Sequence, residues 1–178
     1  MAHFAVTAVG SDQPGIVASV TKVLVDHDCN LEDTSMSILR GHFAMMLVVA
    51  GPESLDAAAL ESSLLNETSG FDLVVAVRQI DDTVPVSPEG DAWTVAVYGS
   101  DKPGIVHSIT SLLADAGVNV VDLTTRVIGD AARPVYAMVL EVTLPPGVSE
   151  KEVAARLETA AAELGVECSL HPSEADIL

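Results

Sequence analysis

Basic and aromatic residues are scarce in this chain of 178 residues. Lysine and arginine number 8 against 26 aspartates and glutamates, a formal charge of −18, and aromatic side chains make up 3% of the sequence. Proteins that grip DNA or RNA neutralise phosphates with lysine and arginine. Direct nucleic-acid binding is therefore disfavoured. The acidic residues are spread over both halves of the chain, which is typical of a solvated surface.

Long hydrophobic runs are missing as well. No stretch approaches the roughly 18 uninterrupted apolar residues that a membrane-spanning helix needs, and residues 1–6 carry no basic region ahead of an apolar segment. We therefore expect a cytoplasmic protein with no membrane contact. Cys29 and Cys168 lie in different halves, and the histidines share no spacing such as His-x-x-x-His, so neither a disulfide nor a metal site is predicted.

Motifs of catalysis are also absent. The sequence contains no nucleophile elbow, no Walker loop, no dinucleotide-binding fingerprint and no paired acid motif. We therefore predict no catalytic residue and no cofactor, and we expect that the protein is not an enzyme.

The chain does contain an eight-residue sequence that occurs twice with one difference, the repeated phrase. Gly-Ser-Asp-Gln-Pro-Gly-Ile-Val at 10–17 returns as Gly-Ser-Asp-Lys-Pro-Gly-Ile-Val at 99–106, a separation of 99 − 10 = 89 residues. When residues 10–30 and 99–119 are aligned without gaps, 12 of the 21 positions carry the same residue. This is too many for two stretches that only share a fold, so the sequence indicates a duplicated domain.

Apolar periodicity and turn residues predict the order strand, helix, strand, strand, helix, strand in each half. In the first half the elements are expected at 3–10, 14–28, 30–39, 43–50, 53–66 and 72–80. In the second half they are expected at 92–99, 103–116, 118–128, 134–144, 149–164 and 166–171. We predict an α+β protein with domains at 1–80 and 92–178, the second ending in a short tail, and a polar, proline-bearing linker at 81–91.

Two differences separate the repeats. Phe43 matches Tyr136 at a separation of 93, so the second hairpin is expected to be four residues longer, near 129–132. Asp28 stands where the second repeat has Gly117, so we expect the ends of the two first helices to differ.

The repeated phrase places a helix N-terminus, with its unpaired backbone N–H groups and partial positive charge, directly after a turn. A carboxylate fits such a place, and glycine lets it approach the backbone closely. The expected donors are the backbone N–H groups of Gly15, Ile16 and Val17 in the first half and of Gly104, Ile105 and Val106 in the second.

Polar side chains complete the predicted site. Asp12 or Asp101, on the same turn, can accept from an ammonium group, and Asn30 or Asn119, at the start of the next strand, is expected to bring a donor and an acceptor to the neighbourhood. The phrase is also ordinary turn and helix-start chemistry, so these residues leave open both an amino-acid site and a purely structural turn. His107, off the core-facing stripe, is expected to face solvent or a subunit, with a ligand role as the alternative.

The two β-α-β-β-α-β units, each opening with Asp-x-Pro-Gly-Ile-Val and a later Asn, resemble tandem ACT domains. Residues 28–35 and 43–47 resemble more narrowly the glycine cleavage system transcriptional repressor family. The resemblance implies a ferredoxin-like fold and amino-acid ligands at the first loop and helix start, often at an interface between ACT units. These implied ligand-binding residues are Asp12, Gly15, Ile16, Val17 and Asn30 in the first half, and Asp101, Gly104, Ile105, Val106 and Asn119 in the second.

We therefore predict a regulatory protein that binds a free amino acid, with glycine or another small one favoured, and acts through a protein partner. The resemblance indicates the transcription of amino-acid metabolism as the regulated process. A detached regulatory subunit of a biosynthetic enzyme and a ligand-free interaction module remain as alternatives. Sheets with one helix-covered face leave the other face and the edges in need of cover, so we also expect the halves to pair pseudo-symmetrically and the chain to form homo-oligomers.

Overall fold

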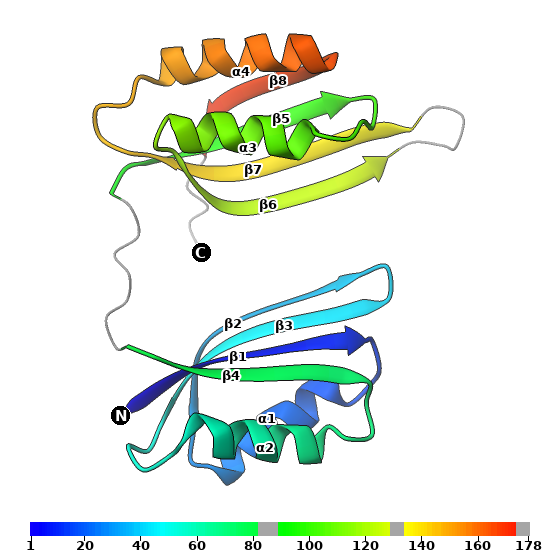
Figure 1. Cartoon of the computed structure of the whole chain (residues 1–178), viewed down its shortest axis with the longest axis vertical. Helices are drawn as coiled ribbons and strands as arrows, with labels where there is room; N and C mark the ends of the chain where they lie inside the picture. Colours follow the sequence, from blue (N-terminus) through cyan, green and yellow to red (C-terminus); the bar gives the residue numbers. More distant parts are fainter. Residues whose placement is uncertain (82–88, 129–133, 174–178) are drawn as a thin grey trace. The chain divides into compact units, whose positions relative to one another are not determined.

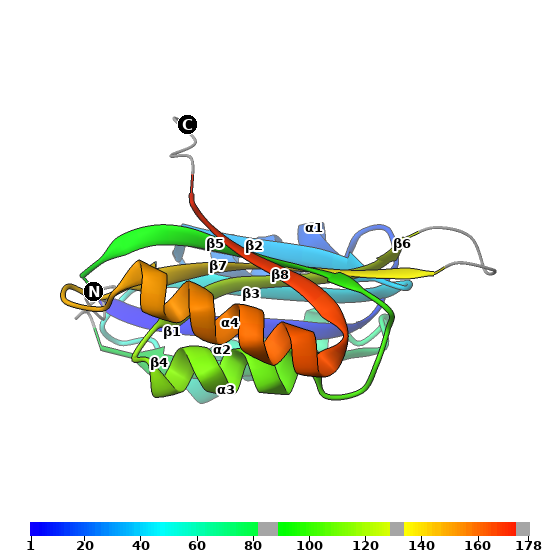
Figure 2. The ribbon, with the colours of Figure 1, turned by 90° about the horizontal axis from the view of Figure 1, so that it is seen from above.

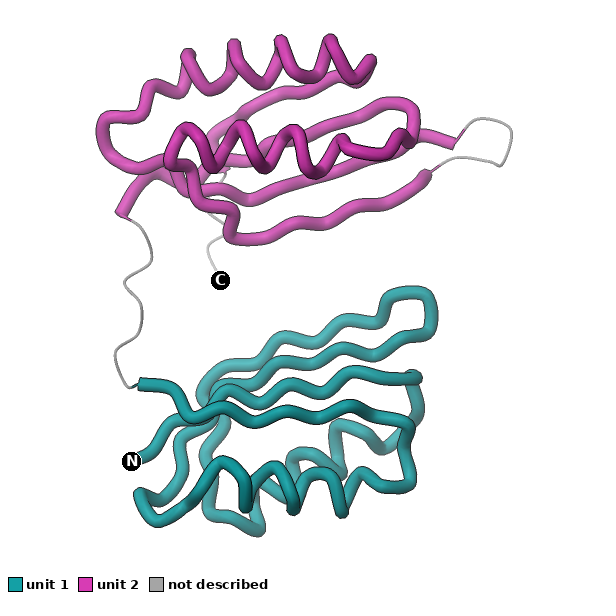
Figure 3. The backbone as a smooth tube through the Cα atoms, viewed as in Figure 1, with its two compact units in different colours: residues 1–85 teal, residues 86–178 magenta. Residues whose placement is uncertain are grey.

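The computed structural model describes residues 1–81, 89–128 and 134–173. It divides the chain into two compact units, Met1–Pro85 and Val86–Leu178 (Figure 3). The central part of the expected linker and the expected hairpin insertion at 129–132 lie outside the described residues. None of the helices in the described part of the chain is long and apolar enough to cross a membrane.

Both units have the predicted order of elements, so the α+β fold with two ferredoxin-like units is confirmed. Unit 1 consists of β1 (Ala2–Ser11), α1 (Ile16–Asp26), β2 (Asn30–Leu39), β3 (His42–Gly51), α2 (Ala57–Glu67) and β4 (Leu73–Ile80). Unit 2 consists of β5 (Asp91–Gly99), α3 (Ile105–Asp115), β6 (Asn119–Ile128), β7 (Val135–Leu144), α4 (Glu150–Leu164) and β8 (Val166–Pro172).

Each unit is one four-stranded antiparallel sheet with two helices on one face (Figures 1 and 2). The strand orders are β2-β3-β1-β4 and β6-β7-β5-β8, so the first strand of each repeat is central and the second is an edge. The central strand β1 is buried on alternate residues only, because the helices cover one face of the sheet. The edge strand β2 has no buried residue at all.

The cores reflect the scarcity of aromatic residues. In unit 1 the helices and sheet enclose Phe4, Phe43 and aliphatic side chains such as Leu47 and Leu60, all at most 2% exposed. The core of unit 2 is built mainly from valine, isoleucine and leucine, with Tyr136 at its margin. Branched aliphatic residues pack well between a sheet and helices, which explains how two small units bury their cores with so few rings.

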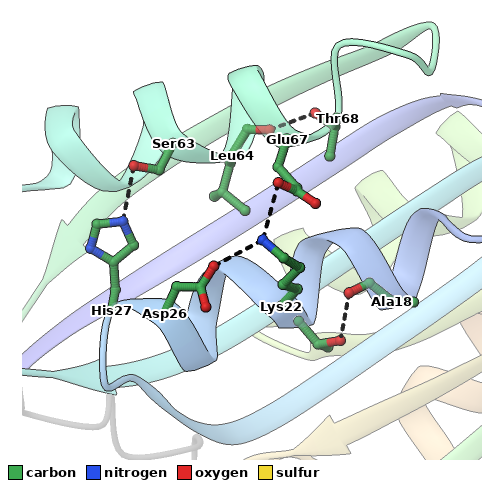
Figure 4. A network of polar contacts seen from close by, with 9 residues as sticks. Ala18, Lys22, Asp26, His27, Ser63, Leu64, Glu67 and Thr68 are labelled. Atoms are coloured by element: carbon green, nitrogen blue, oxygen red, sulfur yellow. Dashed lines mark hydrogen bonds and ion pairs between the residues drawn. The ribbon is translucent and has the colours of Figure 1, made fainter.

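Polar contacts join α1 and α2 on the surface of unit 1 (Figure 4). The Lys22 ammonium donates to Asp26 at 3.0 Å and to Glu67 at 3.2 Å, and His27 Nε2 lies 2.9 Å from the Ser63 hydroxyl. These exposed ion pairs contribute little to stability, typically about 0–1 kcal/mol each. The buried core, rather than these contacts, therefore holds the two helices on the sheet.

The outer edge of β4 receives a different partner. The Glu61 carboxylate of α2 accepts a hydrogen bond from the backbone N–H of Val77 at 2.8 Å. Since β4 is an edge strand, this contact occupies a donor that would otherwise face a foreign strand.

The first helices of the two repeats end in the same way, contrary to expectation. Asp28 has φ 54° and Gly117 has φ 73°, both in the left-handed region. The next N–H groups bond alike, Cys29 to the Leu24 carbonyl at 2.8 Å and Val118 to the Leu113 carbonyl at 2.9 Å. The shared hydrogen bonds impose the conformation, and Asp28 adopts it despite its side chain because aspartate tolerates this region better than most residues.

Candidate functional site

The repeated phrase forms the loop from the first strand to the first helix of each unit. Gly15 has φ 100° and ψ −12°, and Gly104 has φ 96° and ψ −10°. Residues with a side chain rarely adopt this conformation, so backbone geometry alone requires glycine at both places. The two loops therefore have the same local backbone 89 residues apart.

These loops leave the helix N-termini uncapped. No side chain accepts from the first turn of α1 or α3, and the first backbone bonds are Ser19 N–H to Gly15 O and Ser108 N–H to Gly104 O, both 2.9 Å. By contrast, Ser149 caps α4. The N–H groups ahead of Ser19 and Ser108 thus remain available to an anion, in both repeats.

A hollow of about 510 Å³ lies against the loop of unit 1. Its walls come from the loop, α1, β2 and β3, and the residues that line it are Asp12, Gln13, Pro14, Gly15, Ile16, Val17, Ala18, Thr21, Met36 and Phe43. Four of the five predicted site residues of this repeat are therefore brought together. The loop is anchored by the Asp12 N–H, which donates to the Gly41 carbonyl at 3.0 Å.

The asparagines do not lie beside these loops, and that expectation is wrong. Asn30 pairs with Ala50, which pairs with His3 at the beginning of β1, whereas Ser11 marks the end at which the loop follows. His3 and Ser11 are eight residues apart on an extended strand, about 26 Å. Helix α1 carries the chain back along the sheet, so Asn30 stands at the far end of its own unit.

Unit 2 repeats this separation. Asn119 pairs with Thr143, and Thr143 pairs with Ala92 near the beginning of β5, while Gly99 at its other end pairs with Tyr136. A ligand at either loop can therefore contact Asn30 or Asn119 only if that asparagine belongs to another unit of the same fold.

In unit 2, a polar group of side chains surrounds the loop. Burial and the nearby carboxylate of Asp101 raise the pKa of Tyr136, and a hydrogen bond with the Thr125 side chain lowers it in part. The same contacts show that these three side chains lie close together. His107 is exposed, as expected, and its Nδ1 lies 3.4 Å from the Ser111 hydroxyl.

Sequence reasoning missed the wall residues contributed by the hairpin, Met36 and Phe43. The match of Phe43 with Tyr136 was a usable signal, because it placed an aromatic ring at the same strand position in both repeats. The cysteines take no part in the hollow. Burial, with Glu158 nearby, raises the pKa of Cys168 to about 11, and burial also raises the pKa of Cys29.

Two sheets of this topology, each with an uncapped helix start beside a glycine loop, define a regulatory module that binds small ligands. The chain belongs to the ACT domain family, whose sequence profile matches residues 2–78 and 94–171. ACT domains generally bind small amino-acid ligands. This chain contains two ACT domains.

Known proteins similar to this chain include an enzyme and a repressor. Phosphoserine phosphatase SerB2 of Mycobacterium tuberculosis is 28% identical over 144 residues, 80% of this chain and 34% of the phosphatase. The glycine cleavage system transcriptional repressor of Escherichia coli is 27% identical over 125 residues, 70% of this chain and 64% of the repressor. The chain thus spans less than two thirds of the length of both.

A solved structure resembles the whole chain. A protein of Galdieria sulphuraria described as unknown has a TM-score of 0.82 at 28% identity, covering 97% of this chain and 99% of its own. The likeness therefore covers both repeats of this chain.

Proposed function

We propose that this protein is an amino-acid-responsive regulator that binds glycine or another small amino acid at its two glycine loops. The observation that carries the proposal is the duplicated loop, in which Gly15 and Gly104 hold the same backbone conformation at an uncapped helix start. Membership of the ACT domain family supports an amino acid as the ligand.

The ligand's carboxylate accepts from the N–H groups at the start of α1, those of Gly15, Ile16 and Val17, and its ammonium group faces Asp12. In unit 2 the corresponding donors are Gly104, Ile105 and Val106, with Asp101 opposite the ammonium group. Ionised partners make these hydrogen bonds stronger than neutral ones.

The asparagine of the site comes from a second ACT unit in this proposal. Asn30 and Asn119 stand too far from the loops of their own units, so a complete site requires pairing of units in an oligomer. Ligand binding then stabilises one paired arrangement in proportion to its differential affinity for that arrangement.

The output of this binding is a changed interaction with a protein partner in the cytoplasm, one that controls transcription of amino-acid metabolism. The similarity to a glycine cleavage system transcriptional repressor supports that direction. A formal charge of −18 favours a basic protein over DNA as the direct contact. The absence of catalytic motifs in the sequence supports a non-enzymatic role.

Calorimetry of the full chain against each of the twenty amino acids tests the ligand. We expect heat and 1:1 or 2:1 binding with glycine or another small amino acid, and thermal stabilisation of about 1–3 kcal/mol at tens of Kd or above. A chain that binds none of the twenty is a ligand-free interaction module, and the proposal is then wrong.

The double variant Asn30→Ala with Asn119→Ala tests the proposed pairing. Loss of a hydrogen bond to a charged ligand group corresponds to about a tenfold to hundredfold weaker Kd. Asn66→Ala, at an exposed position of α2, is the matched control and keeps wild-type affinity. Unchanged affinity in the double variant would remove the asparagines from the site. Stable co-purification with a biosynthetic catalytic chain would favour a detached regulatory subunit instead.

A further inference from the structure

The hollow of unit 1 has apolar walls opposite its helix start. Met36 of β2 is 50% exposed, and Phe43 of β3 is buried and lines the hollow. The Thr21 hydroxyl already donates to the Val17 carbonyl at 2.8 Å. On the side of the hairpin, a bound amino acid therefore meets the carbon and sulfur atoms of Met36 and Phe43.

The strand pairing identifies the counterparts in unit 2. Met36 stands opposite Met45, and its counterpart Thr125 stands opposite Met138. Phe43 stands opposite Gly10 of β1, and Tyr136 stands opposite Gly99 of β5, the residue that corresponds to Gly10. Both hairpins also carry a register shift at the same place, one residue before Asp33 and one before Asp122. The correspondence is therefore structural and not only an alignment.

Divergence at the wall positions runs in one direction. Of the ten residues that line the hollow of unit 1, six are identical at the corresponding positions of unit 2 and four differ. Each of the four becomes more polar or charged in unit 2, and the changes are Gln13 to Lys102, Ala18 to His107, Met36 to Thr125 and Phe43 to Tyr136. The Asp-x-Pro-Gly-Ile-Val residues of the loop were retained, whereas both lining residues of the hairpin changed.

The polar groups of unit 2 suit a neutral hydroxyl. Thr125 and Tyr136 both carry hydroxyl groups and lie close enough for Thr125 to influence the Tyr136 hydroxyl, and each hydroxyl can donate as well as accept. The Asp101 carboxylate nearby opposes an anionic ligand side chain. The ammonium group of Lys102 is held at the end of α4, where it donates to the Leu164 carbonyl at 2.9 Å.

We infer that the two repeats bind different classes of amino acid: unit 1 an amino acid with a small apolar side chain, and unit 2 one whose side chain carries a neutral hydroxyl. This inference rests on the proposed function, since it concerns the side-chain ends of the same two loops. Met36 and Phe43 in unit 1, and Thr125 and Tyr136 in unit 2, are its specificity-determining residues.

L-valine and L-threonine have nearly the same shape and differ in one methyl against one hydroxyl, so they probe the difference directly. Titration of the full, isotope-labelled chain is followed by NMR at the amide signals of Gly15 and Gly104, which report each loop separately. We expect valine to shift Gly15 at lower concentration than threonine. Threonine should act on Gly104 with a Kd at least about tenfold below that of valine, because a site built around hydroxyl partners rejects the analogue that lacks one.

Exchange of the walls should exchange the preference. Thr125→Met with Tyr136→Phe is expected to make Gly104 respond to valine before threonine. Met36→Thr tests unit 1 at a half-exposed position, where the substitution removes no buried side chain. Ile38→Thr is its control, because Ile38 lies two residues further along β2, is 51% exposed and does not line the hollow.

The outcomes separate the two levels of the proposal. If neither glycine signal responds to any amino acid, the proposed function fails and the inference with it. If both respond but rank valine and threonine alike, the proposed function stands and the inference is wrong. Preferences that survive the wall exchange would also overturn it, because another part of the site would then select the side chain.

Discussion

Replacement of Gly104 by alanine isolates the energetic role of backbone conformation in the glycine loop of unit 2. Gly104 has φ 96°, and no heavy atom lies within 4 Å of where a Cβ would stand. The added methyl group therefore meets no neighbour, and any loss of stability comes from the backbone alone. A side chain in the left-handed region costs about 1–2 kcal/mol, and φ here lies beyond the most favourable part of that region.

We expect Gly104→Ala to lower the free energy of unfolding by about 1–2 kcal/mol, since strain in the folded state exceeds the gain from a less flexible unfolded chain. For a domain of 60–100 residues this corresponds to a fall in Tm of about 4–8 °C per kcal/mol. Urea unfolding and thermal unfolding followed by circular dichroism measure it.

Gly70→Ala is the matched control. Gly70 lies in an exposed turn, its φ is not positive, and its Cβ position is also free of neighbours within 4 Å. We expect a change within about 1 kcal/mol, on the stabilising side. If Gly104→Ala and Gly70→Ala behaved alike, the positive φ would not be what holds glycine in the repeated phrase.

Two further predictions concern the helix ends and the thiols. Asp28→Gly should stabilise the protein and Gly117→Asp should destabilise it, each by about 1 kcal/mol in urea unfolding, because both positions are left-handed; a shift of both in the same direction would contradict this. With its pKa raised to about 11, Cys168 should react with iodoacetamide at pH 8 about a hundredfold more slowly than an unperturbed thiol, followed by mass spectrometry. The rate should climb about tenfold per pH unit up to pH 10, and a plateau near pH 9 would refute the raised pKa.

The order of elements was predictable because glycine and proline punctuate the chain where strands and helices change. Boundaries were less so: α2 begins at Ala57 rather than near 53, because the Leu55 N–H closes a turn onto the Pro52 carbonyl first. Near-alternation in β2 normally marks a half-buried strand. Every residue of β2 is exposed nonetheless, since β2 lies at the sheet edge, a place set by the pairing of its hairpin partner β3 with the distant strand β1.

The candidate site divides in the same way. Residues within one local turn, Asp12 to Val17, were identifiable because the chemistry and the geometry both reside in that turn. Met36 and Phe43 were not, because they reach the hollow through the β2–β3 hairpin. Asn30 was misplaced because closeness in sequence to the end of α1 is not closeness to its beginning, and an eleven-residue helix separates the two.

The positive φ of Gly15 and Gly104 is a requirement of the turn into the helix and does not depend on which ligand the loop binds. A bend that only glycine tolerates will persist in a copy that has changed its metabolite, or lost it, since the bend is needed for the chain to turn into its helix. Sorting such proteins by what they sense therefore calls for the residues at positions 36 and 43 and their duplicates, which differ between the two repeats of this chain while the glycine is the same in both.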